Sequence, residues 1–190
     1  MRRSALLALP LVLIAGAWLG LRALPQQSSA AAVQPPAAMK AMELPGPRVR
    51  LSPAEARSLT PDAGFLRTPS SLLRVDRRLS YGDYVWNDQN VPDGPTWIRV
   101  DLRTQLLSVF RGGHEIGTAV VLYGADSKET PVGRFPILWK GRDHRSSLYD
   151  APMPYTLRLT GDGIAIHGSD VRWGAATHGC VGIPTSFASR

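Results

Sequence analysis

From Trp97 onward, the chain consists of short apolar runs that alternate with polar residues and end at turn-forming residues. Ile98, Val100 and Leu102 alternate with Arg99 and Asp101, and residues 106–110 resume the run after an Arg-Thr-Gln interruption. A period of two with one apolar face is the pattern of a half-buried strand, so these two runs predict a β-hairpin.

Four more segments show similar strand signals: 116–123, 133–139, 155–159 and 164–166. Pro136 lies inside the second of these segments, so an edge or bulged strand is expected there. The strand signals do not alternate with long helical patterns, and a βαβ sheet is therefore not expected. The pattern predicts a mainly β fold, an antiparallel β sandwich or small barrel with short helices.

The N-terminus carries the pattern of an export signal. Two arginines follow Met1, and residues 5–21 then contain no charged side chain. A basic start before an apolar run directs export, and this run is nearly long enough to span a bilayer. Residues 1–24 are therefore expected to be a signal peptide or an N-terminal membrane anchor. The protein is expected in the periplasm or cell envelope, either released or held at the inner membrane.

Residues 25–50 are rich in Ala and Pro without an apolar period, which predicts a linker. Residues 51–95 form an extension whose role the sequence does not assign. Within it, Ser52-Pro53-Ala54-Glu55 has the residues of a helix start, and a short helix to about Leu59 is expected.

The formal net charge of +7 favours an anionic partner. The sequence contains no Lys/Arg-rich run, zinc-finger spacing or aromatic RNA-binding motif, so nucleic acid is not a predicted partner. A solvated basic face accounts for the charge equally well.

Cys180 is the only cysteine, so no intrachain disulfide can form. An unpaired thiol in an exported protein needs an explanation, because the compartment is oxidising. His167 lies at the end of an expected strand, and Gly179 allows a tight turn before the thiol. A helix entered near Pro184 would favour the thiolate through its dipole. The residues alone leave two interpretations, a catalytic nucleophile and a small buried hydrophobe.

Four stretches, in order, resemble the L,D-transpeptidase catalytic family, also called YkuD-like. Thr177-His178-Gly179-Cys180-Val181 is similar to the family signature [S/T]-H-G-C-apolar, and Ile166-His167-Gly168 is similar to its histidine strand. Residues 97–102 with Gln105-Leu106 resemble the opening strands, and 130–135 resembles T-P-x-G-x-F. The resemblance covers residues 96–190, the expected catalytic domain.

The resemblance implies an enzyme with a cysteine nucleophile, acting on the stem peptides of peptidoglycan. Cys180 would attack the bond before the terminal D-Ala of a stem tetrapeptide, with His167 as general base oriented by a carbonyl near Gly168. The thioester would pass to an amine of a second stem peptide or of a wall-linked lipoprotein. Such an enzyme serves cell-wall cross-linking and cell shape, is acylated by carbapenems, and needs no metal or organic cofactor.

The remaining implied roles surround this pair. His178 and Gly179 would shape the oxyanion site, and Thr177 would support its hydrogen bonds. Met153 and Tyr155 are candidates for a wall that faces the substrate. His167 is preferred to His178 as the base, because the ring of His178 can point away from a tight turn.

This chain departs from the family pattern in three places. Gly182 replaces the usual Asn or Arg, the spacing from His167 to Thr177 is short, and ten residues follow Cys180. Family domains usually continue further. Two alternatives therefore stand beside transpeptidation: an L,D-carboxypeptidase or hydrolase that uses the same cysteine, and a non-catalytic wall-binding relative.

Overall fold

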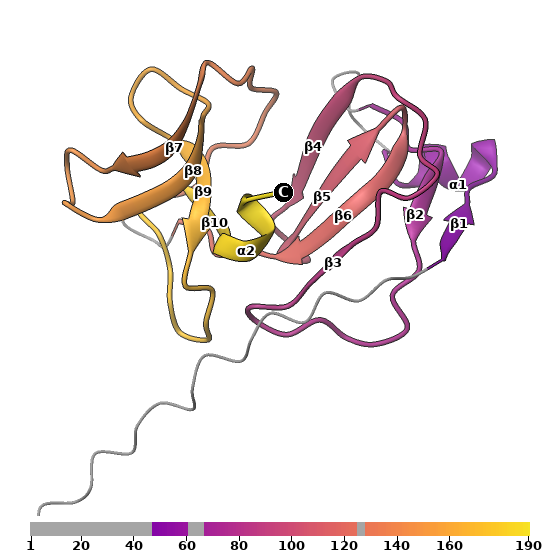
Figure 1. Ribbon diagram of the computed structural model, residues 1–190, viewed down its shortest axis with the longest axis horizontal. Coiled ribbons are helices and arrows are strands. Elements are labelled where there is room, and N and C mark those ends of the chain that lie inside the picture. The colour runs from indigo at the N-terminus through magenta and orange to yellow at the C-terminus, as the bar shows by residue number, and fades with distance from the viewer. Residues whose placement is uncertain (1–46, 61–66, 125–127) are drawn as a thin grey trace, which may run out of the picture. The chain divides into compact units, whose positions relative to one another are not determined.

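The computed structural model describes residues 47–60, 67–124 and 128–190 (Figure 1). The expected export segment 1–24 and residues 25–46 of the expected linker lie outside these ranges. Within them, no helix has both the length and the apolar composition needed to cross a bilayer. All of the described residues belong to one compact unit of the chain.

The first sheet is six-stranded and holds the N-terminal half of the described chain. Its strand order is β1-β2-β6-β5-β4, and β3 also pairs with β6. The hairpin of β4 and β5 aligns Trp97 with Phe110 and Asp101 with Leu106, as the alternating sequence predicts. The strands are β1 (Arg48–Arg50), β2 (Ser71–Leu73), β3 (Tyr84–Trp86), β4 (Thr96–Asp101), β5 (Leu106–Arg111) and β6 (His114–Val120).

The second sheet is four-stranded, in the order β10-β9-β8-β7. Strands β7 to β9 are antiparallel neighbours, but β10 runs parallel to β9. Leu122, just after β6, exchanges two backbone hydrogen bonds with Gly182 and so links β10 to the first sheet. The strands are β7 (Trp139–Arg145), β8 (Pro152–Arg158), β9 (Ala165–Ser169) and β10 (Val181–Pro184).

Two short helices complete the described fold, α1 (Pro53–Ser58) and α2 (Thr185–Ala188). The expected start of α1 is confirmed. Ser52 caps the helix by accepting from the Glu55 N–H, and the Glu55 carboxylate accepts from the Ser52 N–H. This reciprocal capping box satisfies two backbone donors that a helix start otherwise leaves without partners.

The mainly β prediction is confirmed, with corrections in detail. In the described residues the strands form two open sheets rather than a small barrel. The expected strand at 133–139 is wrong: β7 begins only at Trp139, after Pro136, whose ring nitrogen cannot donate to a sheet. Not all pairing is antiparallel, and the extension 51–95 contributes β2 and β3 to the first sheet. The expected linker at 25–50 is wrong at its end, because residues 48–50 form β1 and pair with β2.

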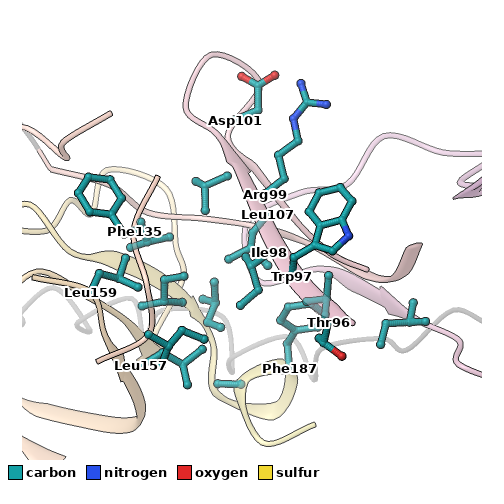
Figure 2. Close-up of a pocket in the computed structure, with 18 of the residues that line it drawn as sticks. Thr96, Trp97, Ile98, Arg99, Asp101, Leu107, Phe135, Leu157, Leu159 and Phe187 are labelled. Atoms are coloured by element: carbon teal, nitrogen blue, oxygen red, sulfur yellow. The ribbon is translucent and has the colours of Figure 1, made fainter. Parts of the chain in front are cut away.

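Apolar side chains from the two sheets form one core. Leu107 and Ala119 of the first sheet cluster with Ile166, Val181 and Phe187. Beside this core runs an apolar groove of about 1770 Å³. Figure 2 shows Ile98 and Leu107 facing Leu157 and Leu159 across it, with Arg99 and Asp101 at its rim.

Candidate active site

Strands β9 and β10 bring His167 and Cys180 to the same face of the second sheet. In the parallel register, Val181 lies beside Ile166 and Gly182 lies beside His167. Side chains alternate along each strand, so Ile166 and Val181 line the groove while His167 and Cys180 face the other way. Continuing the register by one residue places Cys180 beside Ala165, diagonal to His167. Diagonal neighbours in a sheet lie roughly 7–8 Å apart.

His167 is held inside the protein, with only 8% of its surface exposed. Its Nδ1 lies 2.9 Å from the carbonyl oxygen of Gly168, so Nδ1 carries the proton and donates. Nε2 is then unprotonated and can accept a proton. Burial lowers the pKa of His167 below its ordinary value, and the nearby charge of His144 acts in the same direction. The imidazole is thus neutral at pH 7, and its Nε2 can accept a proton.

The Cys180 thiol donates to the carbonyl oxygen of Gly163 at 3.8 Å. This bond directs the thiol toward Gly163, just before β9. Burial raises the pKa of Cys180, and the charge of Asp162 acts in the same direction. A backbone hydrogen bond at Ala165 and the charge of Lys128 lower this pKa and partly oppose the effect of burial. The thiol is therefore protonated at pH 7.

The helix expected to activate the thiol forms but does not reach it. Helix α2 has four residues, and β10 separates its start from Cys180. A helix dipole acts only within about its first turn, so it cannot offset the burial of the sulfur. The expectation of a thiolate favoured by a helix is wrong, and proton removal falls to a neighbouring base.

The turn before Cys180 is tightly packed. Gly179 has φ = 95°, in the left-handed region that suits glycine, and a methyl group there would lie 2.7 Å from Ile164 Cδ1. The Thr177 hydroxyl donates to the Cys180 carbonyl at 2.5 Å, and the Thr177 N–H donates to Tyr123 O at 3.0 Å. These contacts fix the main chain around the sulfur.

His178 points outward from this turn. Its exposed ring stacks on Tyr149, with ring centroids 4.3 Å apart and planes 18° apart. Tyr149 comes from the loop between β7 and β8, so this loop reaches across to the turn that carries Cys180. The stack occupies one face of the His178 ring and leaves the buried His167 as the better candidate base.

The two expected wall residues occupy different surroundings in β8. Met153 is buried, and its carbonyl accepts from the buried Thr156 hydroxyl at 2.6 Å. Tyr155 is partly exposed, has φ = 54°, and lies under the Arg142 guanidinium, 5.8 Å from the ring centre. Of the pair, only Tyr155 has an aromatic surface that a ligand can contact.

Three residues around the turn that carries Cys180 were not among the predicted site residues: Tyr149, Lys128 and Gly163. All three lie in loops distant in sequence from Cys180, and no local motif marks them. His144, expected in a loop, lies in β7, where its ring meets Trp139 edge-on. Among the described residues, no group of three or more His, Cys, Asp or Glu side chains gathers to hold a metal ion.

A match to a family model identifies the protein family of this chain. The model of the L,D-transpeptidase catalytic domain, also named YkuD, matches residues 95–189, which is half of the chain. The chain belongs to this family. The match spans both His167 and Cys180, and the resemblance seen in the sequence motifs is confirmed. Strands β1, β2 and β3 precede the matched region of the L,D-transpeptidase domain.

Solved structures of L,D-transpeptidases are similar to part of the chain. An L,D-transpeptidase from Stackebrandtia nassauensis is 24% identical with a TM-score of 0.45, covering 54% of this chain and 53% of that one. One from Mycobacterium smegmatis is 18% identical with a TM-score of 0.46, covering 50% and 51%. The Enterococcus faecium C442S mutant is 24% identical with a TM-score of 0.45, covering 51% and 44%. The chain thus matches about half the length of these structures. No curated protein matches it.

Proposed function

We propose that this protein is a peptidoglycan L,D-transpeptidase that forms a thioester between Cys180 and a stem tetrapeptide and transfers the acyl group to an amine. The observation that carries the proposal is the placement of His167 and Cys180 on one face of the paired β9 and β10, within a chain of this family. The substrate would be the extracytoplasmic wall polymer, which agrees with the export pattern of residues 1–24.

In the first step, Cys180 turns from Gly163 O and gives its proton to His167 Nε2 as sulfur attacks the carbonyl carbon that precedes D-Ala. A raised thiol pKa and a neutral imidazole favour this concerted transfer over a standing ion pair. The bond from Gly168 O to Nδ1–H holds the imidazole and stabilises its cation. Main-chain N–H groups near Gly179 and Cys180 are the proposed donors to the oxyanion.

Collapse of the tetrahedral intermediate breaks the peptide bond, and His167 returns its proton to the departing nitrogen of D-Ala. The thioester remains on Cys180. An acceptor amine then loses a proton to His167, attacks the thioester carbonyl and releases the thiol. A second stem peptide is the proposed acceptor, and a wall-linked lipoprotein would supply an equivalent amine. Neither half-reaction requires a metal or an organic cofactor.

The test is incubation of the protein with a disaccharide-tetrapeptide muropeptide, with products identified by mass spectrometry. Release of D-Ala and a cross-linked dimer are expected, and Cys180→Ala should give neither. His167→Ala should slow acylation by about 10²–10⁴-fold, the usual contribution of a general base, and His178→Ala by much less. Equal turnover by Cys180→Ala and the parent would refute the proposal.

Two readouts separate the alternatives. A tripeptide product in place of the dimer would identify water as the acceptor, and thus a carboxypeptidase. Intact mass after treatment with a carbapenem should rise by one acyl group in the parent and not in Cys180→Ala. Muropeptide binding without any carbapenem adduct would identify a non-catalytic wall-binding module.

A further inference from the structure

Trp173 is a large aromatic side chain presented to solvent in the second half of the chain. It lies in the loop between β9 and β10, the segment that joins His167 to Cys180, and 84% of its surface is exposed. An indole that remains in water forgoes the burial that normally stabilises the folded state, and an exposed aromatic group beside a site often serves in recognition.

The loop that carries Trp173 is anchored at several points. Val171 is buried and packs with Val120 and Leu122, while Leu79 and Tyr81 border this cluster. The Ala175 N–H closes a turn onto Arg172 O at 3.3 Å, and the Thr177 N–H reaches Tyr123 O. Figure 1 shows this loop beside the turn that precedes β3, and a methyl group added at Gly82 of that turn would lie 3.4 Å from the Val171 carbonyl oxygen. Trp173 therefore projects from a fixed support.

Tyr81 completes an aromatic corner with Trp173. The ring centroids lie 5.6 Å apart with planes at 76°, and the Tyr81 hydroxyl donates to Gln105 Oε1 at 3.0 Å. Because the two rings are nearly perpendicular, the face of one ring lies next to the edge of the other. Arg172 and Asp170, both well exposed and 3.6 Å apart, supply charged hydrogen-bonding groups next to this corner.

A pyranose ring has the chemistry that fits such a corner. One face of the sugar presents C–H groups that contact the electron-rich face of an aromatic ring, and its edge presents hydroxyl and acetamido groups that need polar partners. A lipid surface would require a broader apolar patch without adjacent charges.

We propose that Trp173 and Tyr81 bind the glycan strand of peptidoglycan, a polymer of N-acetylated hexosamines, and so position its stem peptide at Cys180. This inference rests on the proposed function, because the glycan is attached to the peptide that the thiol would attack. Trp173 precedes Cys180 by seven residues, so the two Cα atoms are at most about 25 Å apart.

The experiment compares Trp173→Ala with the parent on two donors, a disaccharide-tetrapeptide and the free tetrapeptide. Loss of one stacking contact should raise KM for the glycan-bearing donor by roughly 3–10-fold and leave kcat unchanged. KM for the free tetrapeptide should not change, and Trp173→Phe should recover most of the loss. Trp139→Ala, which removes an exposed indole from β7, is the matched control and should behave as the parent on both donors.

Binding of N-acetylglucosamine oligomers provides the second arm, measured by titration calorimetry on the parent, Trp173→Ala and Trp139→Ala. The parent and Trp139→Ala should bind, and Trp173→Ala should bind roughly 3–10-fold more weakly. Equal binding by all three, or an equal rise in KM on both donors, would overturn the inference. The carbapenem adduct reports separately on Cys180. If Trp173→Ala is acylated normally and its affinity for the glycan is unchanged, only the glycan site is rejected. If the parent forms no adduct, the proposed function is rejected.

Discussion

At the scale of single residues, Gly179 sets the position of the thiol. Replacing it with alanine places a methyl group 2.7 Å from Ile164 Cδ1, on a backbone with φ = 95°. Strain of this kind costs about 1–3 kcal/mol and is relieved by moving the turn that carries Cys180. Gly179→Ala should therefore lower the melting temperature and slow carbapenem acylation at least tenfold.

Gly161 provides the control for this substitution. It lies in the turn between β8 and β9, and a methyl group there would meet no atom within 4 Å. Gly161→Ala should match the parent in acylation rate and melting temperature. If Gly179→Ala also matches the parent in both measurements, the turn before Cys180 does not constrain the reaction.

His167 predicts how the reaction depends on pH. Its burial lowers its pKa, so the imidazole stays neutral to a lower pH than a free histidine. As pH falls, the base is lost only when His167 takes up a proton, and the acidic inflection of the carbapenem acylation rate should lie below about 6.5. Rates measured by mass spectrometry from pH 4.5 to 8 test this. An inflection above 6.5 would mean that His167 is more solvated than the structure has it.

At the scale of elements, Glu115 of β6 joins the N-terminal extension to the sheet. Its carboxylate accepts the Leu73 N–H of β2 at 2.7 Å, and Arg48 of β1 donates to its backbone carbonyl at 3.0 Å. Glu115 is 4% exposed, and burial raises its pKa despite a hydrogen bond from Ser108 and the charge of Arg48. Compared with the unfolded chain, the folded protein therefore favours the protonated form of Glu115.

The sign of the pH effect follows from this raised pKa. The stabilising contribution is complete below the unfolded carboxyl value of about 4.3 and is lost as pH rises through the folded pKa. Glu115→Gln, which keeps an acceptor for the Leu73 N–H but cannot ionise, should lose less unfolding free energy between pH 4 and 8. Urea unfolding of both proteins measures it. If the unfolding free energies of the parent and of Glu115→Gln change with pH in the same way, ionisation of Glu115 does not destabilise the folded protein.

The elements differ in how far the sequence could predict them. Helix α1 and the β4–β5 hairpin depend on local signals, the capping box at Ser52 and the alternation from Trp97, and both form as expected. Strand β7 has polar residues on both faces because it is an exposed edge, so it shows no alternation. The parallel pairing of β10 with β9 joins strands that the loop at 170–180 separates in the sequence, so no local pattern predicts it.

The same distinction applies to the candidate site. His167 lies in one short motif and Gly179 and Cys180 lie in another, so local sequence patterns were enough to propose them as candidates. Tyr149 reaches His178 from another loop, and Lys128 and Gly163 approach the thiol from two more, so only the folded chain brings them together. The raised pKa of Cys180 is also a property of its packing, which no sequence pattern reports.

At the scale of the whole molecule, several contacts join the two sheets around the apolar core that they share. One is the pair of hydrogen bonds between Leu122 and Gly182, and another is Phe187 of α2. Phe187 is 3% exposed, and its ring lies 5.3 Å from Tyr84 and 5.7 Å from Trp86 of β3. Helix α2 directly follows β10, so Phe187 connects the strand next to Cys180 with the first sheet.

Phe187→Ala should therefore affect stability and the active site together. Removing a buried phenyl ring costs about 3–5 kcal/mol, much of the total stability of a domain. The milder Phe187→Leu keeps the protein folded for measurement and should lower both the melting temperature and the carbapenem acylation rate. Ser186→Ala, on the exposed side of α2, should change neither. If Phe187→Leu lowers the melting temperature and leaves the acylation rate unchanged, β10 holds Cys180 in place without support from the first sheet.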